Sequence, residues 1–103
     1  MKIKHFAGYG TVNAKKIGAK NEGTNIYGEP MKVVVIEVSG NHEWGLERDD
    51  TYDIYNWLVK RFAKDCKSYT DIESMQVNDR YETDDKGFDV EHCTYTIKYK
   101  VAA

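Results

Sequence analysis

The chain has 103 residues, with 41% hydrophobic and 31% charged residues and a formal net charge of −2. This length predicts one domain with one core, spanning residues 1–103. No apolar run approaches the roughly 20 residues of a membrane span, so we expect no membrane partner. The lysines of the first third are scattered and come without arginine, which is untypical of a nucleic-acid-binding surface. We therefore expect no direct contact with nucleic acid.

The N-terminal third combines alternating apolar positions with glycines. Residues 2–20 predict a strand or a hairpin that is interrupted at Gly8-Tyr9-Gly10. Residues 18–30, GAKNEGTNIYGEP, contain three glycines and the only proline, and they predict a long loop. No Gly-Lys-Ser/Thr sequence accompanies these glycines, so they do not form a phosphate loop.

Residues 31–39 predict the central strand of the domain. Val33-Val34-Val35-Ile36 is a run of four β-branched residues, which indicates a strand covered on both faces. Gly40-Asn41 then predicts a two-residue hairpin turn. Alternating apolar and charged residues over 42–47 predict the return strand.

The stretch Gly40-Asn41-His42-Glu43 resembles one signature block of the calcineurin-like metallophosphoesterases, which implies a two-metal site beside Asn41 and His42. Such a site needs several hard ligands around two cations. The upstream Asp-x-His and Gly-Asp-x-x-Asp blocks of that family are absent, because no aspartate precedes Asp49. We therefore interpret the stretch as a hairpin turn, and we expect neither an enzyme nor a metal site.

Residues 50–67 predict one amphipathic helix. Apolar residues recur there at i, i+3, i+4 and i+7 spacing and form a single face. Candidate N-caps precede them, and basic residues gather near the other end, where they complement the helix dipole. The N-caps are Asp49, Asp50 and Thr51; the apolar face is Tyr55, Leu58, Val59, Phe62, Ala63 and Cys66; the basic residues are Lys60, Arg61, Lys64 and Lys67.

The last third predicts a β-hairpin. Its arms are residues 72–81 and 93–101, and Asp84-Asp85-Lys86-Gly87 is the predicted turn. Strict alternation in the second arm gives an apolar face of Cys93, Tyr95, Ile97, Tyr99 and Val101. The predicted fold class is thus α+β, an antiparallel sheet of about four to six strands with the helix packed on one face.

Two cysteines, Cys66 and Cys93, lie far apart, and no secretory signal segment is expected before them. We expect reduced thiols and a location in the host cytoplasm. Cys93 belongs to the apolar face of its strand, which predicts a buried thiol with a raised pKa and little reactivity, while His92 points to the opposite face. The spacing of His42, Cys66, His92 and Cys93 does not match a metal-binding motif. No cofactor, metal or catalytic residue is expected.

Residues 78–91 form an acidic segment with aromatic residues close by. Binding energy concentrates in rings surrounded by a polar rim, and carboxylates steer a protein toward a basic groove of a partner. We predict a partner-binding face here, the alternative being a solvated turn. The predicted contact residues are Asp79, Tyr81, Glu82, Asp84, Asp85, Phe88, Asp89 and Glu91.

The order of a Val-rich strand at 33–36, a Gly-Asn turn at 40–41, a return strand and an acid-capped helix is similar in layout to small anti-CRISPR proteins. The size, mild acidity and Tyr-rich composition of the chain also resemble phage-encoded accessory proteins. This resemblance implies a non-enzymatic inhibitor that blocks a bacterial defence protein, such as the nucleic-acid groove of a Cas nuclease, by protein–protein contact. The basic N-terminal third departs from the uniformly acidic surface of a DNA mimic.

Two other functions fit the sequence. The first is a small-ligand or nucleotide-binding module that uses the Gly/Tyr-rich region 8–28, with Tyr9 and Tyr27 as stacking rings. The second is a structural protein that forms a homo-oligomer through a sheet edge. The sequence does not choose between them.

Overall fold

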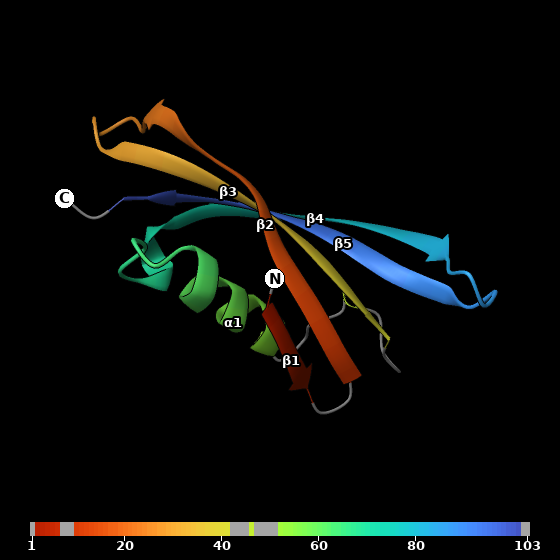
Figure 1. Cartoon of the computed structure of the whole chain (residues 1–103). Helices are drawn as coiled ribbons and strands as arrows, with labels where there is room; N and C mark the ends of the chain where they lie inside the picture. The colour runs from red at the N-terminus through yellow and green to blue at the C-terminus, as the bar shows by residue number, and fades with distance from the viewer. Residues whose placement is uncertain (1, 7–9, 42–45, 47–51, 102–103) are drawn as a thin grey trace.

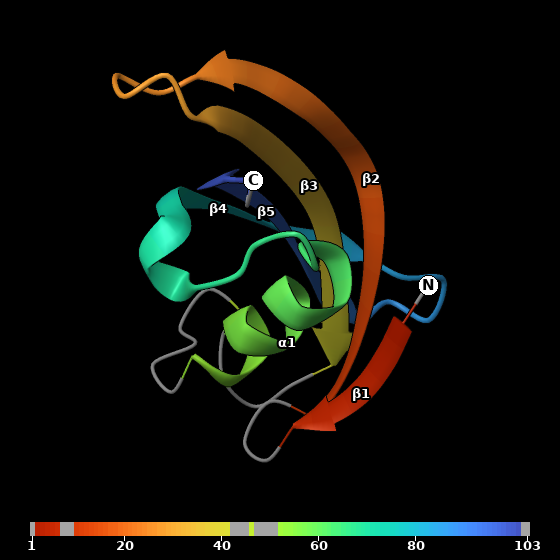
Figure 2. The same cartoon turned by 90° about the vertical axis from the view of Figure 1, so that its left-hand side faces the viewer.

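The computed structural model describes residues 2–6, 10–41, 46 and 52–101. These residues form one five-stranded antiparallel sheet, in the order β1-β2-β3-β5-β4, with a helix on one face (Figures 1 and 2). The elements are β1 (Lys2–Phe6), β2 (Gly10–Thr24), β3 (Pro30–Asn41), α1 (Asp53–Phe62), the 3₁₀ helix η1 (Tyr69–Asp71), β4 (Ile72–Thr83) and β5 (Asp89–Lys100). The antiparallel sheet with one covering helix is as predicted, although the helix is a minor part of the chain. No helix in the described ranges is both long and apolar enough to cross a membrane.

The core lies between the sheet and α1. β3 occupies the middle of the sheet, and its side chains Val34, Ile36 and Val38 are fully buried on the inner face, the face that α1 covers. The expected coverage of both faces is only partly present. On the outer face, Met31 and Val33 are buried, whereas Val35 keeps partial exposure.

The long loop predicted over residues 18–30 is wrong. β2 continues to Thr24 and pairs with β3, and only residues 25–29 form the turn. Asn25 Oδ1 accepts hydrogen bonds from the backbone N–H groups of Tyr27 (2.9 Å) and Glu29 (3.0 Å), and Gly28 adopts a positive φ of 76°. Gly18 and Gly23, which also suggested a loop, instead lie in or beside β-bulges, at register shifts between 16 and 18 and between 21 and 24.

The hairpin turn predicted at Gly40-Asn41 is also wrong. Both residues continue β3, where Gly40 pairs with Val12 of β2 and Glu91 of β5. A Cβ atom on Gly40 would lie 2.9 Å from the Thr11 carbonyl oxygen. The glycine is thus explained by close strand packing rather than by a turn. The predicted return strand at 42–47 falls outside the described residues except for Leu46.

The helix is shorter than the predicted 50–67, because α1 ends at Phe62. The candidate caps at 49–51 lie outside the described residues, and Tyr52 precedes the helix in a left-handed conformation with φ 59°. Ile54, Trp57 and Leu58 face the core. The Trp57 ring meets Phe6 of β1 edge-on at 5.5 Å between centroids, which packs the helix against the edge of the sheet.

The predicted C-terminal hairpin and its turn are confirmed. β4 and β5 pair from Ile72↔Tyr99 to Thr83↔Asp89, so the arms are longer than predicted. The inner face of β5 is buried at Cys93, Tyr95, Ile97 and Tyr99, as the alternation indicated. β4 is an edge strand of the sheet, and β1 lies at the opposite edge.

Candidate functional site

The β4–β5 hairpin projects beyond the region of the sheet that α1 covers (Figure 1). Its turn is held by Asp84, whose Oδ1 accepts the backbone N–H groups of Lys86 and Phe88, both at 2.9 Å. The Asp84 N–H also donates to the Phe88 carbonyl at 2.8 Å, and Gly87 takes the required positive φ of 84°. An aspartate side chain that accepts the backbone N–H groups of its own turn gives the hairpin a well-defined tip.

The inner face of the hairpin carries a cluster of Asp79, Glu91 and Cys93. The Cys93 thiol donates to Asp79 Oδ1 at 3.3 Å and approaches Glu91 Oε2 at 3.7 Å. Burial raises the pKa of the Cys93 thiol, and the two carboxylates raise it further. Cys93 is fully buried, so the predicted inert thiol is confirmed in its burial and in the direction of its pKa.

Glu91 is the one buried charged residue of the described core, with 1% of its surface exposed. Burial raises the pKa of its carboxyl to about 7, with a further contribution from the neighbouring Asp79 carboxyl. A hydrogen bond from the Leu46 backbone N–H, at 2.7 Å, favours the ionised form instead. Glu91 therefore belongs to the buried core and does not lie on the exposed surface of the hairpin.

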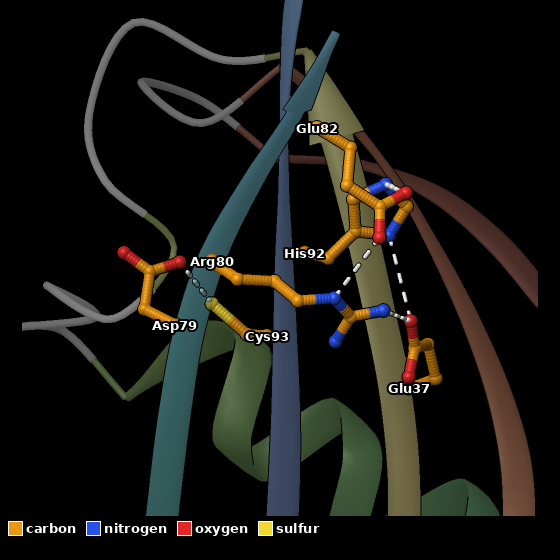
Figure 3. Close-up of polar contacts among 6 residues, drawn as sticks. All are labelled: Glu37, Asp79, Arg80, Glu82, His92 and Cys93. Atoms are coloured by element: carbon orange, nitrogen blue, oxygen red, sulfur yellow. Dashed lines mark hydrogen bonds and ion pairs between the residues drawn. The ribbon is translucent and has the colours of Figure 1, made fainter. Parts of the chain in front are cut away.

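The outer face of the hairpin carries a charged network, defined here as Glu37, Arg80, Glu82 and His92 (Figure 3). The Arg80 guanidinium donates through Nη2 to Glu37 of β3 and through Nε to Glu82 Oε1, the latter at 3.1 Å. His92 lies across the strands, with Nε2 3.4 Å from Glu82 Oε2 and Nδ1 3.5 Å from Glu37 Oε1. The network joins the three strands β3, β4 and β5.

His92 is oriented away from the buried thiol. Figure 3 shows it with Glu37 on one side of the strands and Asp79 with Cys93 on the other, which agrees with the predicted opposite faces. His92 Nδ1 is buried and makes no hydrogen bond within the described ranges. Metal-ligand atoms do come within 4.8 Å of one another in the trio Asp79, Glu91 and Cys93. That trio differs from the set considered from the sequence, which was His42, Cys66, His92 and Cys93. Of these, His42 lies outside the described residues.

The predicted contact residues are divided among four environments. Asp79 and Glu91 belong to the inner cluster, and Glu82 is engaged in the outer network. Asp84 is used by the turn. The residues left at the surface are Tyr81 and Phe88, with 61% and 69% exposure, and the carboxylates Asp85 and Asp89.

The alternative ligand-stacking pair is described only at Tyr27. Tyr27 is 79% exposed in the turn after β2. Tyr9 lies outside the described residues, but Gly10, next to it in sequence, begins the other end of β2. The fifteen residues of β2 lie between these ends. The described part of this region, residues 10–28, is therefore a long strand and its turn rather than one loop.

Sequence reasoning did not anticipate Glu37, Arg80 and His92 as a group. A signal was present in part, because Arg80 and Glu82 are two apart and share a face of a strand. The positions of Glu37 and His92 beside them depend on the pairing of β3 with β5, in which Ser39 lies opposite His92. Comparisons with protein-family models, with curated protein sequences and with solved structures find no match to this chain.

Proposed function

We propose that this protein is a non-enzymatic, phage-type inhibitor that binds a bacterial defence protein through the tip of its β4–β5 hairpin. The supporting observation is the pair of exposed rings at this tip, Tyr81 and Phe88, at 61% and 69% exposure. Neither ring contributes to the core. Rings of this size, surrounded by polar groups, are the side chains in which binding energy usually concentrates.

The charge beside these rings favours a basic partner surface. Asp85 and Asp89 are exposed, and neither pairs with a basic side chain among the described residues. Glu82, by contrast, is engaged with Arg80 and His92. Carboxylates without a basic partner, placed around aromatic anchors, suit a groove that would otherwise receive nucleic-acid phosphates, as in a Cas nuclease.

The shape of the molecule supports the same function. Its principal extents are 50 × 23 × 20 Å, and the hairpin forms one end of the long axis (Figure 1). The outer network braces this arm against β3 through Arg80 and Glu37. A braced arm loses less conformational freedom on binding than a flexible loop. An inhibitor of this kind needs no catalytic group, cofactor or metal.

A direct inhibition assay tests the proposal. The binding of labelled target DNA by purified Cas nuclease–guide complexes is measured with increasing amounts of this protein. The wild type is expected to reduce DNA binding. The double variant Tyr81→Ala with Phe88→Ala is expected to inhibit at least about tenfold less well. Asp85→Lys with Asp89→Lys is expected to lose inhibition through charge repulsion.

The opposite turn supplies a matched control. Ile26 and Tyr27 are 91% and 79% exposed at the β2–β3 turn, so Ile26→Ala with Tyr27→Ala removes similar apolar surface elsewhere. This control is expected to inhibit like the wild type. Equal loss in both double variants would argue against a site at the β4–β5 tip. If the wild type inhibits no Cas nuclease, Cas nucleases are excluded as the partner.

A second candidate function is homo-oligomerisation through β4. This strand has 12 residues, pairs on one side only, and contains no proline or lysine, two residue types that often protect a sheet edge. Light scattering after size exclusion would decide this function. A mass above 11.9 kDa that rises with protein concentration supports it, and a constant monomer mass excludes it.

A further inference from the structure

A groove of about 490 Å³ lies beyond the C-terminal end of α1. Its volume falls within the range of small-molecule sites, roughly 300–1,000 Å³. Lys60, Lys64 and Lys67 line it, together with the buried side chains Val59 and Ala63. No acidic residue lines this groove among the described residues. It therefore combines an apolar floor with three ammonium groups.

The three groove lysines have no carboxylate partner within the described ranges. Four lysines elsewhere do have one, with Nζ–oxygen distances of 3.4, 3.1, 3.6 and 3.0 Å for Lys20, Lys32, Lys98 and Lys100. The helix dipole accounts for Lys60 only, because the effect fades beyond the last turn. α1 ends at Phe62, and Lys64 and Lys67 follow that end. Their charges are available to a ligand.

Two carboxylates close to Cys66 of the groove make contacts with other groups. Asp65 accepts hydrogen bonds from the Lys32 ammonium and the Tyr99 hydroxyl. Asp71 lies 3.4 Å from Lys100 Nζ. Both carboxylates are thus engaged by other groups, and neither lines the groove. A second groove of about 580 Å³ is different, because the Lys98 and Lys100 that line it are paired with acidic residues.

An aromatic ring stands at the rim of the groove. Tyr69 begins η1 and is 50% exposed. Its ring lies 6.3 Å from the Tyr55 ring at an interplanar angle of 38°, which supports it from one side. The exposed part of such a ring offers a surface on which a planar base can stack. The hydroxyl of Ser68, also at the groove, adds a polar group.

We propose that this groove binds a nucleoside diphosphate. Lys60, Lys64 and Lys67 contact the phosphates, and the base stacks on Tyr69. Three ammonium groups match the charge of a diphosphate better than that of a single carboxylate. The site is independent of the hairpin tip, which lies at the other end of the molecule (Figure 1), so either assignment can fail without the other.

Isothermal titration calorimetry at low salt tests the site with three probes: ADP, pyrophosphate and adenosine. ADP is expected to bind with one site per chain and more tightly than either fragment. Lys64→Gln with Lys67→Gln should weaken ADP binding by about tenfold or more, because each lost charge removes a charge-assisted contact. Tyr69→Leu should weaken ADP binding but leave pyrophosphate binding unchanged.

Lys86→Gln is the matched control, since Lys86 is an exposed lysine in the β4–β5 turn. It is expected to bind ADP like the wild type. Circular dichroism confirms that each variant folds. The proposal is overturned if ADP does not bind the wild type, if Lys86→Gln weakens it as much as the groove variant, or if pyrophosphate binds as tightly as ADP. Binding of a single-stranded oligonucleotide but not of ADP also overturns it in favour of a nucleic-acid site.

Discussion

The Glu91 carboxylate accepts a hydrogen bond from the Leu46 backbone N–H at 2.7 Å, and both residues are buried. The Tyr95 hydroxyl donates to the Leu46 carbonyl at 3.1 Å. Side chains of β5 thus satisfy both backbone polar groups of Leu46, whose own side chain is fully buried. An acidic group with a raised pKa therefore holds Leu46 against the inner face of the sheet.

Glu91→Gln is expected to change the pH dependence of stability. The folded-state pKa of Glu91, about 7, lies above its ordinary value of 4.5, so the folded protein binds more protons between these values. The stabilising contribution of this group is complete below about 4.5 and is lost as the pH rises through about 7, a change on the order of 2–3 kcal/mol. The substituted glutamine does not titrate and still offers an acceptor to Leu46. The variant should therefore exceed the wild type in stability at about pH 8.

Urea denaturation between about pH 5 and pH 8 measures this effect. Glu22→Gln is the control, because Glu22 makes only a surface ion pair with Lys20, at 3.4 Å. It is expected to follow the pH profile of the wild type. Parallel profiles for the wild type and Glu91→Gln would contradict the titration of Glu91 in this range.

The two glycines Gly40 and Gly18 are expected to respond to alanine in opposite directions. A Cβ at Gly40 would meet the Thr11 carbonyl oxygen at 2.9 Å, and this backbone atom cannot rotate away. Gly40→Ala should therefore destabilise the protein by about 1–3 kcal/mol. At Gly18 the nearest atom is Val35 Cβ at 4.0 Å, so Gly18→Ala should stabilise by about 0.4–1 kcal/mol through a less flexible unfolded chain. Thermal denaturation of both variants checks the signs, and a neutral Gly40→Ala would show that β2 and β3 can separate at no cost.

Asp84→Ala is expected to weaken the β4–β5 turn. Asp84 Oδ1 accepts two backbone N–H groups, and removing such an acceptor costs about 1 kcal/mol. Asp85→Ala should change the free energy of unfolding by less than about 0.5 kcal/mol, as for other exposed positions. The same denaturation experiment compares the two. Equal effects would mean that the Asp84 side chain does not hold the turn, and Asp84 substitutions could then also be used in binding tests.

The two hairpin turns show how far the sequence predicts this fold. Asn25-Ile26-Tyr27-Gly28 and Asp84-Asp85-Lys86-Gly87 share the same hydrogen-bond pattern, with an Asx first and a glycine of positive φ fourth. The second turn is predictable because clear alternation flanks it. The first is hidden by Gly18 and Gly23, which indicate a loop locally. Pairing with β3 overrides that local preference, and a single sequence does not contain the pairing.

The candidate site is less predictable than the fold for a related reason. Acidic residues between 79 and 91 are adjacent in sequence, but strand alternation sends Glu91 inward and Glu82 outward. Tyr81 and Phe88, whose exposure needs only a projecting hairpin, can be identified from the sequence. Glu37 cannot, because its contact with Arg80 spans 43 positions and requires the strand order of the sheet.

Tyr99→Phe is expected to destabilise the contact between β5 and the segment that follows α1. The Tyr99 hydroxyl donates to Asp65, which also accepts from Lys32 Nζ at 3.1 Å. Burial opposes ionisation of Asp65, but these hydrogen bonds lower its pKa overall. The loss of one hydrogen bond to a charged group should cost about 1–2 kcal/mol.

The control for this substitution is Tyr27→Phe, which removes a hydroxyl from a ring that is 79% exposed, and it should have no effect. The folded-state pKa of Asp65 lies below its ordinary value of 3.8. Its stabilising contribution is therefore present above about pH 4 and is lost as the pH falls through the folded-state pKa. The deficit of Tyr99→Phe, measured by urea denaturation, should accordingly be largest at neutral pH and shrink toward about pH 3. A deficit that is independent of pH would mean that the hydroxyl acts through packing and not through the Asp65 carboxylate.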